Sequence, residues 1–279
     1  MAKYKLNLID SKNIYGTMNC GTIKLSNLTN ADKMILAKNH NTSLEEITNH
    51  EITKEDKNCI FNAHRMALGE TMGFDWHKMF MADQKTKDGS YFEITSEYVE
   101  ANPNGWSDID EDILIITNKV PGVAIGHPVA DCPVIVMEDK SKGVTAMAHC
   151  SAELIDKKMP MMIADALNKA YDSKDEDIIA YVSACAGDNW TYDKYPSWAT
   201  DRNIWEKGLI EDKNGIFHIN LKKAIQQEMN ERNINHVIYN DNDTITNPSY
   251  YSNSAASPYG LNDQSKYGRN FCGAFYKTK

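Results

Sequence analysis

A cysteine and a histidine stand at the ends of neighbouring apolar runs in the middle of this 279-residue chain. Cys132 separates the runs 122–125 and 133–137, and His149 ends the next run, 143–148. Short β-branched runs between Gly, Pro and Asp are typical of strands, so we expect both side chains at strand ends. A thiol and an imidazole can together bind a soft metal such as zinc or act as a nucleophile and its base. The pattern alone leaves both interpretations open.

Two further polar side chains lie close to this pair in the sequence. His127 precedes Cys132 and is the candidate third zinc ligand, because catalytic zinc usually has three protein ligands and an open position. Asp131 comes directly before Cys132 and is a candidate to orient the base or to contact a substrate amino group. Turn formation before Pro133 explains Asp131 equally well.

The elements that must position these residues follow from hydrophobic periodicity. The spacing predicts a helix over Asn58–Met72 that stops at Gly73, while the polar residues 31–57 are expected to form surface structure. Strands are predicted at about 112–118, 122–127, 133–138, 143–149, 177–183, 236–239 and 270–276, and helices over about 151–172 and after Asn220. This alternation predicts the α/β class, with one layered domain over residues 1–279.

Composition narrows the class of protein. The formal net charge of -9 disfavours a general nucleic-acid partner, and there is no run of 18 apolar residues that would predict a membrane span. The first residues do not read as an export signal, so the six scattered cysteines are expected to be reduced and the protein cytoplasmic. A small-molecule substrate remains the expected partner, and the sequence leaves the oligomeric state open.

Several motifs in a fixed order resemble one family. The segments are NAHRMALGETMGFDWHKMFMADQ, GVAIGHPVADCPVIVMED, VTAMAH, YYSNSAASPYG and KYGRNF. Together they resemble the YfiH-like laccase-domain family, which is also described as multicopper polyphenol oxidases and as purine nucleoside phosphorylases. The resemblance implies an α/β layered sandwich with a metal site made by His, Cys and His.

The resemblance assigns roles to particular residues and shows departures. It implies that Cys132 and His149 hold two of the three metal positions, and Thr86 stands where the family has the first histidine. It also implies substrate contacts for Gln84, Ser252 and Arg269.

Family arginines are replaced at three other places, where the chain reads Met18, Glu153 and the stretch 251–255. The anion-binding part of the family site is therefore expected to differ.

The function implied by the resemblance is chemistry on a purine nucleoside or a related small molecule, by phosphorolysis or by deamination. Zinc is the favoured metal, and copper is less favoured because the eight scattered histidines contain no HxH pair. Loss of the third ligand favours a second interpretation, in which Cys132 and His149 form an amidase-type dyad. A third interpretation is a catalytically inactive protein of the same fold that binds a nucleotide or metabolite.

Overall fold

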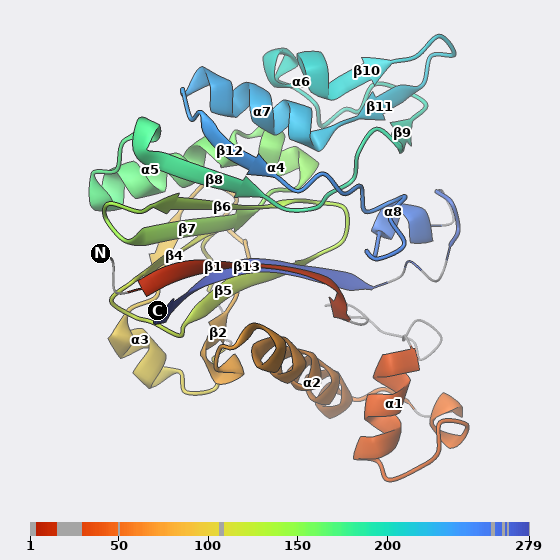
Figure 1. Ribbon diagram of the computed structural model, residues 1–279. Helices are drawn as coiled ribbons and strands as arrows, with labels where there is room; N and C mark the ends of the chain where they lie inside the picture. The colour runs from red at the N-terminus through yellow and green to blue at the C-terminus, as the bar shows by residue number, and fades with distance from the viewer. Residues whose placement is uncertain are drawn as a thin grey trace.

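The computed structural model describes residues 4–15, 30–49, 51–105, 109–257, 260–263, 266 and 268–278 (Figure 1). The strands are β1 (Tyr4–Tyr15), β2 (Met79–Phe80), β3 (Tyr91–Glu93), β4 (Ile113–Thr117), β5 (Ala124–Val129), β6 (Val134–Asp139), β7 (Val144–His149), β8 (Ile178–Val182), β9 (Trp190–Tyr192), β10 (Leu209–Glu211), β11 (Phe217–Ile219), β12 (His236–Tyr239) and β13 (Arg269–Thr278). The α-helices are α1 (Asn30–Asn39), α2 (Lys54–Met72), α3 (Ser96–Ala101), α4 (Ala152–Asp156), α5 (Met159–Tyr171), α6 (Arg202–Gly208), α7 (Leu221–Glu231) and α8 (Asn253–Ala256). Short 3-10 helices cover Glu46–Asn49, Trp76–Lys78 and Asp175–Asp177.

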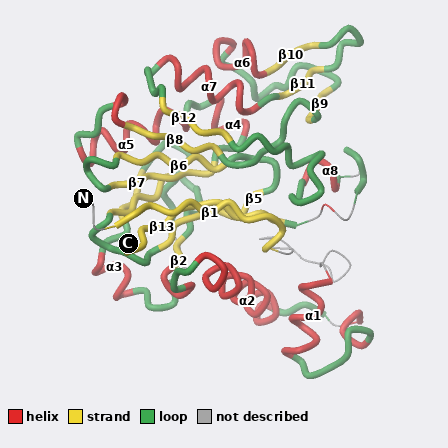
Figure 2. The backbone as a smooth tube through the Cα atoms, in the orientation of Figure 1, coloured by secondary structure: helices red, strands yellow, loops and turns green. Residues whose placement is uncertain are grey.

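The strands form three sheets (Figure 2). The largest has the order β12-β8-β6-β7-β4-β3, and a second has the order β1-β13-β5-β2. A small third sheet, β10-β11-β9, lies beside α6 at the top of Figure 1. The mixture of sheets and helices confirms the predicted α/β class.

Alternating side chains give the two large sheets their stacking. Along β4, Ile113 and Ile115 join the core beneath α4, α5 and α7, whereas Leu114 and Ile116 face the second sheet. Because successive side chains of a strand point to opposite faces, one apolar strand can serve both cores. The result is a layer of helices, a six-stranded sheet and a four-stranded sheet (Figure 1).

A fourth layer covers the outer face of the four-stranded sheet. Leu68 of α2 packs with Phe271 and Phe275 of β13 in a separate apolar cluster. In the same sheet, Gly126 of β5 faces Gly273 of β13. A Cβ on Gly273 would lie 2.0 Å from the Ile125 carbonyl oxygen, so this close approach of the two strands requires glycine.

Most predicted elements are present, with shifted ends. The predicted helix over Asn58–Met72 begins earlier, at Lys54, because Thr53 and Asp56 form a capping box that sets its start. Gly73 ends it with φ of 82°, as predicted. The predicted helix over 151–172 is two helices, with Pro160 in the first turn of α5, where its missing N–H is tolerated.

Some of the structure goes beyond what the sequence predicts. Residues 31–57 contain α1, whose Leu36 is fully buried in a cluster with Ile47 and Ile60, so this segment is more than surface structure. The β9–β11 sheet is absent from the predicted elements, because its strands have only three residues each. No helix in the described part of the chain is long and apolar enough to cross a bilayer.

Candidate active site

The connection between the two large sheets brings the candidate residues together. β5 belongs to the four-stranded sheet and β6 to the six-stranded sheet, so the turn that carries Cys132 crosses between them. His149 pairs in register with Val134, and the backbone N–H of Cys150 donates to the Pro133 carbonyl at 2.8 Å. These contacts hold the end of β7 against the turn at Cys132.

His127 joins the same cluster from the neighbouring sheet. Its ring stacks on that of His149, with 4.8 Å between the ring centroids and an interplanar angle of 9°. Burial lowers the pKa of His149 to about 4, and the positive charge of Arg269 contributes to that decrease. The pKa of His127 is also lowered, by burial first and then by His149 and Arg269. Both imidazoles are therefore neutral near pH 7.

Cys132 is a protonated thiol in this arrangement. Burial raises its pKa to about 12, and the charge of Asp131 adds to the increase. The backbone N–H of Ala152 and the charge of Arg269 oppose this shift. A thiolate–imidazolium pair with His149 is accordingly not preformed, because both groups favour their neutral forms.

Asp131 is engaged in contacts that shape the turn. Its carboxylate accepts hydrogen bonds from the Thr244 hydroxyl at 2.8 Å and from the Ser254 backbone N–H at 2.6 Å. Its carbonyl accepts from the Ala186 N–H at 2.8 Å, and its φ of 84° is unusual for a non-glycine residue. Both carboxylate oxygens thus accept hydrogen bonds that hold the turn carrying Cys132.

The predicted substrate-binding residues occupy different environments. Arg269 begins β13 and acts electrostatically on Cys132, His127 and His149, and one of its guanidinium N–H groups donates to the Gly268 carbonyl at 2.8 Å. Ser252 is fully buried, and its hydroxyl caps α8 by accepting from the Ala255 N–H at 3.0 Å. The contacts of Ser252 are those of a helix cap.

The side chain of Gln84 forms hydrogen bonds with His149. Its side-chain oxygen lies 2.8 Å from His149 Nδ1, and its amide nitrogen lies 2.9 Å from the His149 carbonyl oxygen. No local pattern signals this pairing, because 65 residues separate the two. The position of Gln84 beside Thr86 in the family loop is the one signal that could have pointed to it.

The side chains do not fit the metal that the resemblance implies. No three His, Cys, Asp or Glu side chains of the described residues are grouped so that they could hold one ion. The lone pairs of an imidazole lie in its ring plane, so the stacked, nearly parallel rings of His127 and His149 do not aim at a common point.

Two other histidines each contact a carboxylate instead. His64 contacts Asp32 at 2.6 Å, and His77 contacts Asp75 at 3.0 Å. Thr86, at the position of the missing histidine, forms a hydrogen bond with the Ser90 hydroxyl at 2.7 Å. Met18, at one of the replaced arginine positions, lies outside the described residues.

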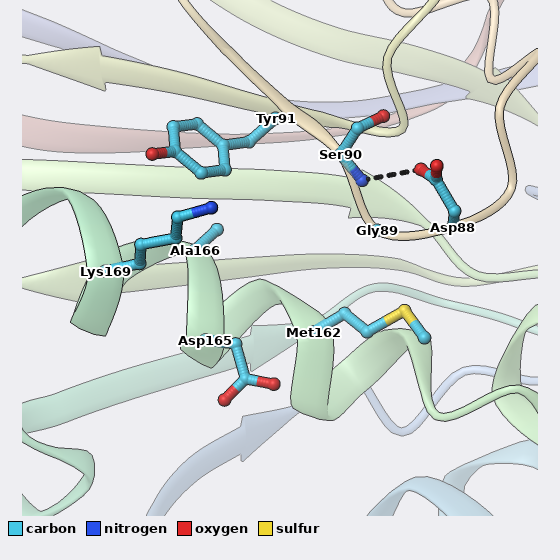
Figure 3. A pocket seen from close by; sticks show the side chains of 8 residues that line it. All are labelled: Asp88, Gly89, Ser90, Tyr91, Met162, Asp165, Ala166 and Lys169. Carbon is cyan, nitrogen blue, oxygen red and sulfur yellow. Dashed lines mark hydrogen bonds between the residues drawn. The ribbon is translucent and has the colours of Figure 1, made fainter.

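A separate pocket of about 620 Å³ lies between the start of β3 and α5 (Figure 3). Lys169 Nζ lies 5.8 Å from the centre of the Tyr91 ring, and the Ser90 N–H donates to the Asp88 carboxylate at 3.0 Å. The pocket is lined by Asp88, Gly89, Ser90, Tyr91, Met162, Asp165, Ala166 and Lys169. None of the predicted catalytic or metal-binding residues lines it.

Comparison with known proteins agrees with the fold and with the family resemblance. The family model described as multi-copper polyphenol oxidoreductase laccase matches residues 37–272. The structure is similar to that of the Bacillus licheniformis hypothetical protein YfiH, with a TM-score of 0.62 and 16% identity over 77% of this chain and 80% of that one. It is also similar to YlmD from Geobacillus stearothermophilus, with a TM-score of 0.63 and 15% identity over 77% and 80%.

A Neisseria meningitidis protein of the DUF152 family gives a TM-score of 0.59 and 12% identity over 81% of this chain and 83% of that one. At these identities the likeness concerns the fold. No curated protein matches the chain.

Proposed function

This chain belongs to the multi-copper polyphenol oxidoreductase laccase family, and on that premise we propose that it is an enzyme acting on a purine nucleoside or a related small molecule. The observation that carries the proposal is the grouping of two neutral, stacked imidazoles in the positive field of Arg269. The same cation acts on Cys132. A positive charge beside neutral hydrogen-bonding groups favours an anionic reactant such as phosphate.

Phosphorolysis uses such a site directly. Phosphate forms a bond to C1′ of the ribose, the bond from C1′ to the purine nitrogen breaks, and the departing base takes a proton. Arg269 would attract the phosphate and offset its charge, and neutral His149 would accept and return a proton. The pKa of about 4 makes His149 a weak base, and a bound anion would raise that pKa by offsetting the charge of Arg269.

Deamination is the second candidate, and one observation favours it. The family arginines are absent at 18, 153 and 251–255, so the charge available for a phosphate is smaller than the family pattern implies. Attack of water on C6 of adenosine, with release of ammonia, requires a base for the water but no anion clamp. His149 is neutral and would accept that proton, as a weak base with a pKa of about 4.

A nucleoside panel assayed with and without phosphate tests the proposal. Free base and ribose 1-phosphate that appear only with phosphate support phosphorolysis, and phosphate-independent conversion of adenosine to inosine supports deamination. His149→Gln should abolish either reaction, whereas His236→Gln, an exposed histidine on β12, is the matched control. If no nucleoside is turned over, the proposal fails and a binding protein becomes the better account.

The amidase-type dyad has its own test. Iodoacetamide should alkylate Cys132 more slowly than a free cysteine at pH 7.5, because the raised pKa leaves little thiolate. Rapid, selective alkylation of Cys132 would instead favour a cysteine hydrolase. Stoichiometric zinc lost in Cys132→Ala would contradict the metal-free account of the site.

A further inference from the structure

The side-chain amide of Gln84 is held in one orientation by backbone carbonyls. Its nitrogen donates to the His149 carbonyl at 2.9 Å and approaches the Asp112 carbonyl at 3.4 Å. Turning the amide over would place its oxygen against these two carbonyl oxygens, where no hydrogen bond is possible. The amide oxygen must therefore be the atom that lies 2.8 Å from His149 Nδ1.

This orientation determines which nitrogen of His149 carries the proton. An amide oxygen only accepts hydrogen bonds, so Nδ1 must be the donor. In a neutral imidazole the other nitrogen, Nε2, then has the lone pair. His149 can thus accept a proton or bind an electrophile only through Nε2.

The surrounding backbone keeps Gln84 in place. Gln84 is 8% exposed and has a φ of 53°, in the left-handed region that a non-glycine residue rarely adopts. The following loop is fastened by the fully buried Asp112, whose carboxylate accepts from the N–H groups of residues 87–89 at 2.7 to 2.9 Å. The unfavourable backbone conformation of Gln84 is compensated by the contacts that its side chain makes with His149.

We infer that Gln84 is a positioning residue that holds His149 as the Nδ1–H tautomer, with Nε2 as its reactive nitrogen. This role differs from the substrate contact that the resemblance implies for Gln84, because both ends of its amide contact protein groups. The loop in which the family resemblance implies a metal ligand thus holds His149 through its Nδ1 atom. The catalytic consequence rests on the proposed function, whereas the tautomer does not.

The test compares two substitutions of similar size. Glu at position 84 keeps an oxygen that accepts from Nδ1, and its second oxygen can face the His149 and Asp112 carbonyls only as a protonated O–H donor. Met keeps the volume but has neither an acceptor nor a donor. Long-range 1H–15N correlation spectra of 15N-histidine-labelled protein distinguish the two tautomers, and the His149 signals are identified by their absence in His149→Gln. His218, whose Nδ1 lies 2.8 Å from the Asp188 carbonyl oxygen, is an internal control in every sample.

The wild type and Gln84→Glu should both hold the proton on Nδ1, and Gln84→Met should lose most of that signal while His218 is unchanged. In the nucleoside assay, Gln84→Met should lower kcat by about 10- to 100-fold, by analogy with losing the group that hydrogen-bonds a metal-bound histidine. Gln84→Glu should retain more of the activity. A proton on Nε2 in the wild type, or an unchanged tautomer in Gln84→Met, would overturn the inference.

If Gln84→Met does not fold, the wild-type and Gln84→Glu spectra still decide the tautomer. If no nucleoside is turned over, the spectra still report the tautomer of His149. If the tautomer is wrong, any nucleoside turnover that is measured remains valid. The two proposals therefore fail separately.

Discussion

Glu228 lies on α7 with none of its surface exposed, and neither carboxylate oxygen receives a hydrogen bond of normal geometry from the described residues. Burial raises the pKa of this carboxyl to about 9. The backbone of Met161 and the charge of Lys158 oppose the shift, whereas the charges of Glu231 and Asp201 add to it. Glu228 is therefore protonated in the folded protein at neutral pH.

The cost of that protonation follows from linkage. In the unfolded chain the carboxyl has its ordinary pKa of 4.5 and is ionised at pH 7. At about 1.4 kcal/mol for each pH unit, the interval from 4.5 to 7 costs the folded state about 3 kcal/mol. Glu228→Gln is neutral in both states, so it should raise the free energy of unfolding by about this amount at pH 7.

The sign of the pH dependence is equally specific. Between pH 4.5 and 9 the unfolded state binds fewer protons at this site, so its contribution to stability falls as the pH rises. The advantage of Glu228→Gln should be close to zero near pH 4.5 and should grow toward pH 9. Urea unfolding of both proteins at pH 5, 7 and 8.5, followed by tryptophan fluorescence, measures this difference.

Glu206→Gln, at an exposed position on α6, is the matched control and should show no such growth. A constant difference between Glu228→Gln and the wild type across the three pH values would refute the reasoning. That result would mean that the Glu228 carboxyl is ionised in the folded state and that neighbouring groups stabilise its charge.

Three other outcomes are expected. Arg269→Met should raise the pKa of His149 from about 4 without restoring its usual value, because burial, the larger cause, remains; an unchanged NMR titration would exclude the Arg269 effect. Asp131→Ala should destabilise the protein by about 2 to 4 kcal/mol, because the Thr244 hydroxyl and the Ser254 N–H lose their acceptor. Asp131→Asn should destabilise it less, and equal melting temperatures for the two variants would contradict this. Gly273→Ala should lower the melting temperature sharply because its Cβ would lie 2.0 Å from a β5 carbonyl oxygen, and an unchanged value would show that the strands separate easily.

Local sequence patterns are sufficient to predict the strands around Cys132 and His149. The apolar runs around Cys132 and His149 predict β5, β6 and β7, because burial on both faces requires nearly continuous apolar strands. Asn220 and Gly73 mark helix ends correctly, since caps depend on a few neighbouring residues. The order of the motifs along the chain also indicates the family, because that order is a property of the sequence alone.

Only the tertiary structure decides how the candidate residues work. The stacking of His127 on His149 depends on two sheets meeting, and the contact of Gln84 with His149 joins residues 65 positions apart. The pKa shifts of Cys132 and His149 arise mainly from burial, which a sequence does not specify residue by residue. Residue types therefore indicate which chemistry is available, and the three-dimensional environment sets protonation, tautomer and the poor fit to a metal.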